Sequence, residues 1–230
     1  MPVPSVEKCY DSLAGDWDAA RQQPSPTARL FSRFFRRELG SRSVRVLDAG
    51  CGNCRNSIFL AEKFPRASFW CVDFSQKMVE KAEERVGRLS LSRRFSIRKS
   101  GVAKLPFSPG FFDAVISIAV LHHLSSKPRR EAAFREMFRV LKPGGVAFAT
   151  VWNKNQPKFR GAGRETLVAW KKKNGETLHR YYYFYSKTEL ASLAAKAGFQ
   201  VVDAFFEKSG KRHAEKGAKN LCLFLRKPVA

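Results

Sequence analysis

The chain has 230 residues, a length that suits one large hydrophobic core and disfavours two independent domains. Hydrophobic residues make up 44% of the sequence and include 20 phenylalanines, which excludes an intrinsically disordered protein. The net charge is +23 and the pI is near 10.3, values that are unusual for an enzyme of neutral metabolites and indicate a polyanionic partner such as RNA. The same positive net charge would also be expected if the proteins of the source organism are basic in general.

The cysteine pattern and the absence of apolar runs bear on the cellular compartment. The five cysteines are odd in number and mostly lie in apolar segments, which favours reduced thiols over a disulfide framework. No apolar run approaches the roughly 20 residues that span a bilayer, and the N-terminus lacks the pattern of a signal peptide. We therefore expect a cytoplasmic protein with no membrane association.

The predicted elements begin with two helices, at residues 6–20 and 27–39, which we expect to form a lid within residues 1–40. Residues 41–151 then alternate short apolar runs with amphipathic stretches, the pattern of a parallel sheet with helices on both faces. The expected strands are 44–48, 68–72, 95–98, 112–117 and 146–151, and the expected helices are 54–63, 76–86 and 127–141.

The last of these helices should end at a turn over residues 142–145, because Pro143 and the following glycines cannot continue it. Residues 152–186 form a basic and aromatic insertion, which we expect to recognise the substrate. Residues 187–230 are expected to complete the sheet with a helix at 187–197 and a hairpin of strands 199–206 and 221–226. The basic loop over 207–220 is expected to be solvated and mobile.

A glycine loop follows the first predicted strand, in the segment Asp48-Ala49-Gly50-Cys51-Gly52. Glycines let the backbone approach a nucleotide-type ligand, at the carboxyl edge where α/β sheets bind ligands. Asp73 ends the second strand, where its carboxylate is placed to accept hydrogen bonds from both hydroxyls of a ribose. Together these features indicate a cofactor that contains a nucleoside.

The loop resembles the first motif of class I methyltransferases, a D-x-G-x-G sequence that holds the methionine end of S-adenosylmethionine, whereas a dinucleotide loop would be G-x-G-x-x-G. The resemblance continues through Asp73-Phe74-Ser75 with Met78, Leu105-Pro106-Phe107, Phe112-Asp113 and the segment 141–145. It implies a doubly wound, Rossmann-like α/β fold with a mostly parallel seven-stranded sheet and an antiparallel last strand. This sequence has Cys54 in place of the usual third glycine, and Gly101 in place of the acidic residue that contacts adenine.

A narrower resemblance rests on segments outside the cofactor motifs. They are Ile116 to Leu124 with its two histidines, Val151-Trp152, Arg180-Tyr181-Tyr182, Tyr10 to Ala14 with Ala20-Arg21, and Leu221 to Phe224. These segments resemble the tRNA methyltransferases that esterify 5-carboxymethyluridine at the wobble position. Members of that family typically work with a small zinc-binding activator subunit at the edge strand of the sheet, which is expected to be the third strand here.

The resemblance implies a set of ligand contacts. The expected S-adenosylmethionine contacts are Tyr10, Arg21, Asp48, Gly50, Cys51, Gly52, Asp73, Phe74, Ser75, Met78, Val102, Ile118 and Ala119. The expected tRNA contacts are Trp152, Asn153, Lys171, Lys172, Arg180, Tyr181 and Tyr182, and the expected catalytic residues are His122, Arg180 and Tyr181.

Within this set we expect Arg180 to pair with the substrate carboxylate, His122 and Tyr181 to shape the pocket, and Trp152 to stack on the base. A carboxylate with a pKa near about 4 to 5 is ionised at neutral pH, so its methylation requires no general base.

Several alternatives remain open. The motif Cys51-Gly52-Asn53-Cys54 is formally C-x-x-C, but Cys51 lies inside the cofactor loop, and zinc would need two further ligands, with His122 and His123 as distant candidates. We therefore expect no metal site. A methyltransferase of small molecules shares the core motifs, and a non-catalytic RNA-binding protein could retain the same fold.

Overall fold

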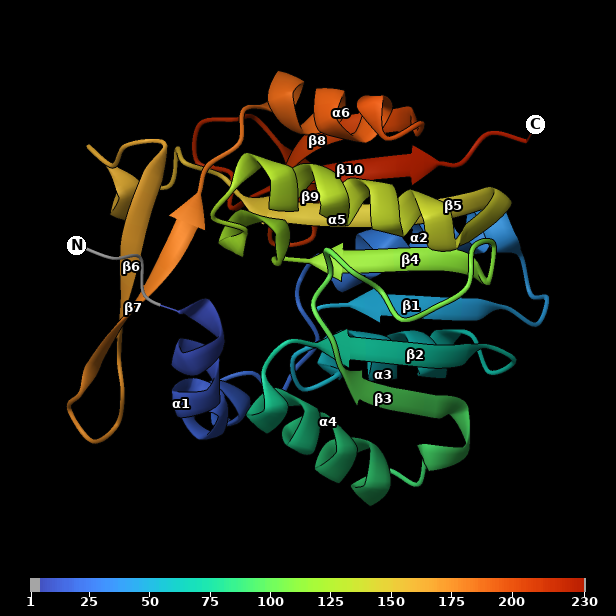
Figure 1. The fold of residues 1–230 in the computed structure, drawn as a ribbon, viewed down its shortest axis with the longest axis horizontal. Helices are drawn as coiled ribbons and strands as arrows, with labels where there is room; N and C mark the ends of the chain where they lie inside the picture. The colour runs from blue at the N-terminus through green and yellow to red at the C-terminus, as the bar shows by residue number, and fades with distance from the viewer. Residues whose placement is uncertain (1–4, 230) are drawn as a thin grey trace.

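The computed structural model describes residues 5–229, which form one eight-stranded sheet with helices on both faces and a separate two-stranded sheet (Figure 1). The helices are α1 (Val6–Ala19), α2 (Ala28–Leu39), α3 (Arg55–Lys63), α4 (Gln76–Arg88), α5 (Lys127–Val140) and α6 (Lys187–Lys196). The strands are β1 (Arg45–Ala49), β2 (Ser68–Asp73), β3 (Phe95–Lys99), β4 (Phe112–Ile118), β5 (Leu141–Trp152), β6 (Glu165–Lys171), β7 (Thr177–Tyr183), β8 (Gln200–Lys208), β9 (Lys211–His213) and β10 (Asn220–Arg226).

The strand order of the large sheet is β3-β2-β1-β4-β5-β10-β8-β9. The first five strands are parallel, while β10 runs antiparallel between β5 and β8. The predicted fold class is thus confirmed, and β3 lies at an edge as expected. The structure has eight strands rather than seven because β9 pairs with β8 inside the loop that was expected to be mobile.

The segment 142–145, which was expected to be a turn, lies within the bounds of β5. Leu141 pairs with Phe112, and the register shifts before Ala114 pairs with Val146. Gly144 has a φ of 74°, and its N–H donates to the carbonyl of Lys227 over 2.9 Å. The chain therefore makes a local irregularity at the glycines and stays bound to the sheet.

Two apolar clusters lie on the two faces of the sheet. One joins the sheet to α5 and α6, and the other joins it to α2 and α3. Phe34 of α2 stacks on Phe224 with 4.1 Å between the ring centroids, and Phe31 packs against Phe148 at 5.6 Å. The expectation that both N-terminal helices form a lid is therefore wrong for α2, whose apolar face is part of the core.

The insertion contains a β-hairpin of β6 and β7 that the sequence analysis did not predict. Its turn contains Asn174-Gly175, with Gly175 at a φ of 88°. The hairpin lies beside α1, near the carboxyl ends of the parallel strands (Figure 1). Within residues 5–229 no helix is both long enough and apolar enough to cross a membrane.

Candidate active site

The glycine loop turns back on the end of β1 and is held by β2. The N–H groups of Gly50 and Cys51 both donate to the carbonyl of Val72, over 2.8 and 2.9 Å. Gly50 has a φ of 92°, and a Cβ added there would lie 2.3 Å from a methyl carbon of Val120. Both the backbone conformation and the close approach therefore require glycine at position 50.

Cys54 keeps the backbone of the glycine that it replaces. Its φ is 57°, in the left-handed region, and its side chain is fully buried in the apolar cluster beside α2 and α3. Such a backbone costs a non-glycine residue about 1–2 kcal/mol. Cys54 is therefore buried beneath the loop in a backbone conformation that favours glycine.

Asp48 does not reach the ligand side of the loop, contrary to expectation. It lies in the central strand β1, and its buried carboxylate accepts a hydrogen bond from Ser57 Oγ over 2.5 Å. Burial raises the pKa of this carboxyl well above its usual value. Asp48 therefore connects β1 to α3 beneath the loop.

A cavity of about 270 Å³ opens at the carboxyl ends of the strands, above the glycine loop. It brings together residues from α1, the loop, β2, β4, β5 and β7. Of the expected site residues it is lined by Tyr10, Arg21, Gly50, Cys51, Gly52, Asp73, Phe74, Met78, Ile118, Ala119, His122, Trp152, Arg180 and Tyr182.

Asp73 presents a buried carboxylate at the end of β2. Its two oxygens accept hydrogen bonds from the N–H of Gly52 at 2.9 Å and from the N–H of Ser75 at 3.0 Å. Burial raises its pKa to about 6, against the opposing effect of these two hydrogen bonds, and the nearby Asp11 adds to the increase. The carboxylate is thus fixed in orientation and titrates close to neutrality.

A second cavity, of about 760 Å³, adjoins the first. The two share Phe74, Val120 and His123, and the second is also lined by Gly101 and Val102. Asp73, which lines the first cavity, directly precedes the shared residue Phe74 in the chain. An elongated ligand in the first cavity, which Asp73 lines, can therefore extend past Phe74 into the second.

A chain of hydrogen bonds with a fixed direction links α1 to the hairpin. His123 Nδ1 lies 3.0 Å from the carbonyl oxygen of Tyr181, which only accepts, so Nδ1 carries the proton. Nε2 then accepts from the hydroxyl of Tyr10 at 2.9 Å, and that hydroxyl accepts from Nη1 of Arg180 at 3.4 Å. Burial lowers the pKa of His123 to about 3, so its ring is neutral.

Three side chains that line this cavity, those of Arg55, His122 and Arg180, each have a buried nitrogen with no partner in the part of the chain that the structure describes. In Arg180 this nitrogen is Nε, and in His122 it is Nε2. The N–H of Trp152 donates to Nδ1 of His122 over 3.4 Å, so the neutral ring carries its proton on Nε2. Burial and the neighbouring charges lower the pKa of His122 well below its usual value. A ligand with acceptor oxygens would satisfy both groups, because leaving buried donors unpaired is costly.

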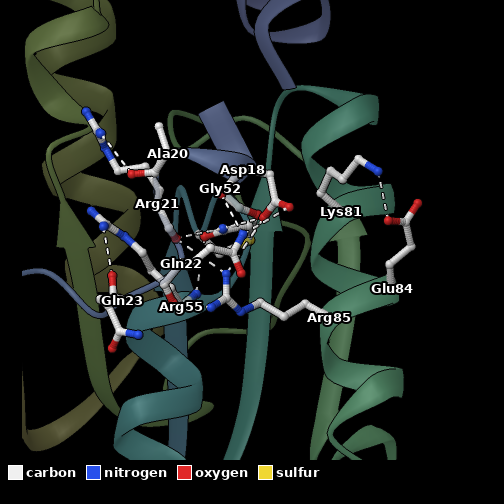
Figure 2. A network of polar contacts seen from close by, with 12 residues as sticks. Asp18, Ala20, Arg21, Gln22, Gln23, Gly52, Arg55, Lys81, Glu84 and Arg85 are labelled. Carbon is white, nitrogen blue, oxygen red and sulfur yellow. Dashed lines mark hydrogen bonds and ion pairs between the residues drawn. The ribbon is translucent and has the colours of Figure 1, made fainter. Parts of the chain in front are cut away.

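The C-terminal end of α1 is fastened to the glycine loop and to α4 (Figure 2). Nδ2 of Asn53 donates to Asp18 Oδ1 at 2.6 Å and to the carbonyl of Arg21 at 3.1 Å. Arg85 of α4 donates to the carbonyls of Arg21 and Gln22 (Figure 2). The end of α1 and the segment that follows it are thus held against the glycine loop and α4, and Trp17, Ala20 and Arg21 line the cavity.

Several expected site residues lie away from both cavities. Tyr181 points to the opposite side of β7 from Arg180 and Tyr182, because side chains alternate along a strand, and its hydroxyl donates to the carbonyl of Ser125. Ser75 caps α4 and donates to Asp11, while Asn153 donates to the carbonyls of Glu215 and Ala218.

The basic residues of the hairpin are also outside the cavity. Lys171 is exposed, and Lys172 pairs with Glu176 and donates to Ser12 Oγ. Trp152 does line the cavity, but the Lys158 ammonium lies 3.6 Å from one of its ring centroids and the Tyr182 ring packs against it at 4.9 Å. The ring of Trp152 therefore already packs against Lys158 and Tyr182.

The structure adds residues that the sequence analysis missed. Trp17 of α1 lies over Gly52, where an added Cβ would be 3.1 Å from its ring. Arg55, the first residue of α3, also has a buried unpartnered Nε and lines the cavity, as does Lys219 from the far end of the chain. The signal available in the sequence for Arg55 was its position three residues after the glycine loop, at the start of a predicted helix.

Within residues 5–229 no group of three His, Cys, Asp or Glu side chains is arranged to hold a metal ion. The five cysteines are all free and buried.

Comparisons with known proteins agree with this geometry. The family described as methyltransferase domain matches residues 46–145. An uncharacterised methyltransferase of Encephalitozoon cuniculi is 34% identical over 206 residues, which cover 86% of this chain and 88% of the relative. The chain belongs to the S-adenosylmethionine-dependent methyltransferases.

Other relatives of this methyltransferase have named substrates. A malonyl-[acyl-carrier protein] O-methyltransferase of Geobacter sulfurreducens is 29% identical over 91% of this chain and 75% of its own length. A tRNA (carboxymethyluridine(34)-5-O)-methyltransferase of Arabidopsis thaliana is 34% identical over 66% of this chain, which corresponds to 33% of that longer protein.

Solved structures share the fold of the methyltransferase. An S-adenosylmethionine-dependent methyltransferase from Clostridium acetobutylicum has a TM-score of 0.75 at 14% identity, covering 96% of this chain and 99% of its own. The complex between the Haloferax volcanii Trm112 methyltransferase activator and a methyltransferase gives a TM-score of 0.70 at 16% identity, covering 98% and 99%.

The residues of the site fit S-adenosylmethionine. The close approach at Gly50 leaves backbone rather than side chain at the ligand surface, and Asp73 presents a carboxylate at the adjoining strand end. The two adjoining cavities suit a molecule with an adenosine at one end and an amino acid at the other.

Proposed function

We propose that this methyltransferase esterifies the carboxylate of 5-carboxymethyluridine at the wobble position of a tRNA. The observation that carries the proposal is that Arg180 and His122 both line the cofactor cavity and that each has a buried donor, Nε and Nε2, without a partner among the described residues. An acceptor with two oxygens and a negative charge satisfies both, and the guanidinium favours a carboxylate.

The site orients the acceptor and needs no base. S-adenosylmethionine, when bound, supplies an electrophilic methyl group. The carboxylate is already ionised, with an ordinary pKa near about 4. Burial raises the pKa of Tyr10 and lowers that of His123 to about 3, so neither group exchanges a proton near neutral pH. Alignment and exclusion of water are the tasks left to the protein.

The tRNA substrate is supported by the relatives and by the charge. The Arabidopsis relative is named for the same carboxylate, and it is 34% identical to this chain over 66% of this chain's length. The net charge of +23 suits a polyanionic substrate. Because the chain spans only a third of that relative, tRNA specificity is our proposal for this chain.

Within the site we assign the cofactor as follows. Asp73 accepts from the ribose hydroxyls, the adenine lies in the cavity lined by Phe74, Gly101 and Val102, and Arg21 pairs with the methionine carboxylate above Gly50 to Gly52. Gly101 has no carboxylate to accept a hydrogen bond from the adenine amino group. We therefore assign the contacts with adenine to the backbone around Val102.

The Asp73 assignment predicts a pH dependence of cofactor binding. Its pKa is about 6 in the free protein, and ribose donors favour the charged form, so affinity for S-adenosylmethionine should be constant above about pH 7 and weaken up to about tenfold per unit below pH 6. Calorimetric titrations between about pH 5 and 8 measure this. The Asp73→Asn variant is the control and should bind weakly with no break near pH 6; a break retained in that variant would contradict the assignment.

The same raised pKa has a consequence for stability. The native state holds the Asp73 proton more tightly than the unfolded chain, whose carboxyl titrates near about 3.9. The contribution of Asp73 to the free energy of unfolding therefore falls as the pH rises from about 4 to 6.

We further propose that a small activator subunit docks at the free edge of β3, as a Trm112 activator accompanies the Haloferax methyltransferase. β3 pairs only with β2 among the described strands, and Arg98 and Lys99 at its end are exposed. A partner strand could add to this edge.

The decisive experiment incubates the protein, with and without such an activator, with tRNA and labelled S-adenosylmethionine, followed by mass spectrometry of the nucleosides. We expect label in the methyl ester of 5-carboxymethyluridine, with higher turnover when the activator is present. Label in another nucleoside would contradict the substrate assignment. Equal stability and activity of the chain alone would contradict dependence on the activator.

A second candidate is methylation of a carboxylate on a small or carrier-bound acid. The Geobacter relative is named for such a substrate, and the Arg180 and His122 donors suit any carboxylate. A parallel reaction with malonyl-acyl carrier protein in place of tRNA separates the two: label in the carrier protein and none in tRNA would favour this candidate.

A further inference from the structure

The positive charge of the chain is unevenly distributed over its helices. The helix α1 carries Glu7, Asp11, Asp16 and Asp18 against one lysine. On α4, Lys77 and Lys81 pair with acids of the same helix, as Lys127 and Arg139 do on α5. The helix α1 is therefore net acidic and α4 is nearly balanced, whereas α5 has five cations against two acids.

By contrast, α2 displays a stripe of arginines. Arg29, Arg33, Arg36 and Arg37 are all exposed and follow one another at helical spacing. The one acid of α2, Glu38, pairs with Arg37 and Arg226. Arg29 and Arg33 form no ion pair with any described residue, so their charge is available to a ligand.

A second group of cations lies in the connection from β8 to β10. Lys208, Lys211, Lys216 and Lys219 are exposed, while Arg212 pairs with Asp203. Arg212 lies 4.1 Å from the ring centroid of Phe205, on the sheet face that α2 covers.

The two groups meet at the mouth of the active-site cavity. The turn before β9 touches the segment that leads into α2, where a Cβ on Gly210 would lie 2.5 Å from the carbonyl oxygen of Pro26. Only three residues of the cavity lining are exposed, and they are Ala20, Pro26 and Lys219. The exposed rim of the cavity therefore includes Pro26, three residues before Arg29 of the arginine stripe, and Lys219 of the connection.

We infer that the surface formed by Arg29 and Arg33 of α2, together with Lys219 at the rim of the cavity, is a docking site for the phosphate backbone of RNA. The inference rests on the proposed function and extends it to the residues that hold the nucleic acid. Cations at and beside the rim can bind phosphates that flank a nucleoside inserted into the cavity, without reading the base sequence.

The surface suits RNA better than an anionic membrane. Amphipathic helices that bind lipid surfaces expose large apolar side chains beside their basic residues. The apolar face of α2 is buried in the core, with Phe31, Phe34 and Phe35 almost fully covered. The exposed side of α2 therefore has charge and no large apolar group to insert.

The test is the double variant R29Q/R33Q in the full chain. Its matched control, K187Q/K196Q, removes two exposed cations from α6 on the opposite face of the sheet. Binding to an unmodified tRNA transcript is measured by fluorescence anisotropy at several salt concentrations. We expect R29Q/R33Q to weaken binding roughly tenfold and to reduce the slope of log K against log salt by up to about two. The control should match wild type, and the affinity for S-adenosylmethionine should stay the same in both variants.

An unchanged salt slope and affinity in R29Q/R33Q would overturn the docking surface, even if tRNA is methylated. The expected loss of binding in a protein that never methylates tRNA would support the surface and contradict the proposed function. Vesicles containing phosphatidylserine form a third arm. Wild-type binding to them that is tighter than to tRNA, and is lost in R29Q/R33Q, would overturn the assignment to RNA.

Discussion

Replacing Arg180 with alanine is expected to lower kcat/KM for methyl transfer to tRNA by roughly 30-fold to several thousand-fold, which corresponds to about 2–5 kcal/mol. The side chain is 3% exposed, and its Nε has no partner among the described residues. If the substrate carboxylate is that partner, truncation removes the interaction and leaves the carboxylate unpaired in a buried site. Cofactor binding should change far less, because Arg180 does not contact the glycine loop through any hydrogen bond in the structure.

Two variants sharpen this experiment. Arg160→Ala removes an exposed arginine from the same insertion and should leave methyl transfer within about twofold of wild type. Arg180→Lys keeps the charge but lacks the guanidinium fork, so it should recover only part of the loss. Thermal unfolding and calorimetry with S-adenosylmethionine verify that each variant is folded. Intact transfer by Arg180→Ala at subsaturating tRNA would show that the assignment is wrong.

Replacing Gly50 with alanine is expected to weaken S-adenosylmethionine binding by at least roughly 30-fold. The new Cβ would overlap a Val120 methyl carbon at 2.3 Å, and the φ of 92° is one that alanine rarely adopts. Overpacking and backbone strain each cost about 1–3 kcal/mol, and both act directly on the loop that borders the cavity. Calorimetry with the cofactor measures the loss.

The matched control is Gly87→Ala, at a helical glycine with no atom within 4 Å, which should bind the cofactor normally. The double variant Gly50→Ala/Val120→Ala separates the two causes. It removes the overlapping methyl groups but retains the unfavourable φ, so partial recovery is expected. Normal binding by Gly50→Ala alone would refute the requirement for glycine.

The sheet and the cofactor end of the site were predictable because their signals are local. Each parallel strand is a short apolar run, and Gly50, Gly52 and Asp73 lie at strand ends, so the topology alone brings them together. The edge position of β3 followed from the same strand order.

The substrate end of the site was harder to predict because it depends on which side chains of β7 face the cavity. Without a predicted strand over β7, nothing distinguished the cavity side of Tyr182 from the opposite side of Tyr181. The signal was present in Asn174-Gly175, a strong hairpin turn between alternating residues. Lys219 reaches the site through tertiary packing alone, which no local pattern reveals.

The role of α2 was misjudged for a related reason. Its arginines suggest a surface element, yet its three buried phenylalanines at helical spacing belong to the sheet core. Cys54 is a case in which the backbone could not be predicted from the residue type. Its backbone has the left-handed conformation that favours glycine, which a cysteine at this position does not indicate.

Tyr10 belongs to two sets of interactions at once. It lines the cavity with the Asp73 carboxylate, and its hydroxyl joins His123 to Arg180 of the hairpin. A ligand that contacts Tyr10 from the cofactor side is therefore linked to Arg180, the side chain that we propose faces the acceptor. Such linkage is reciprocal by thermodynamic necessity: whatever factor the cofactor contributes to the affinity for the acceptor, the acceptor returns to the affinity for the cofactor.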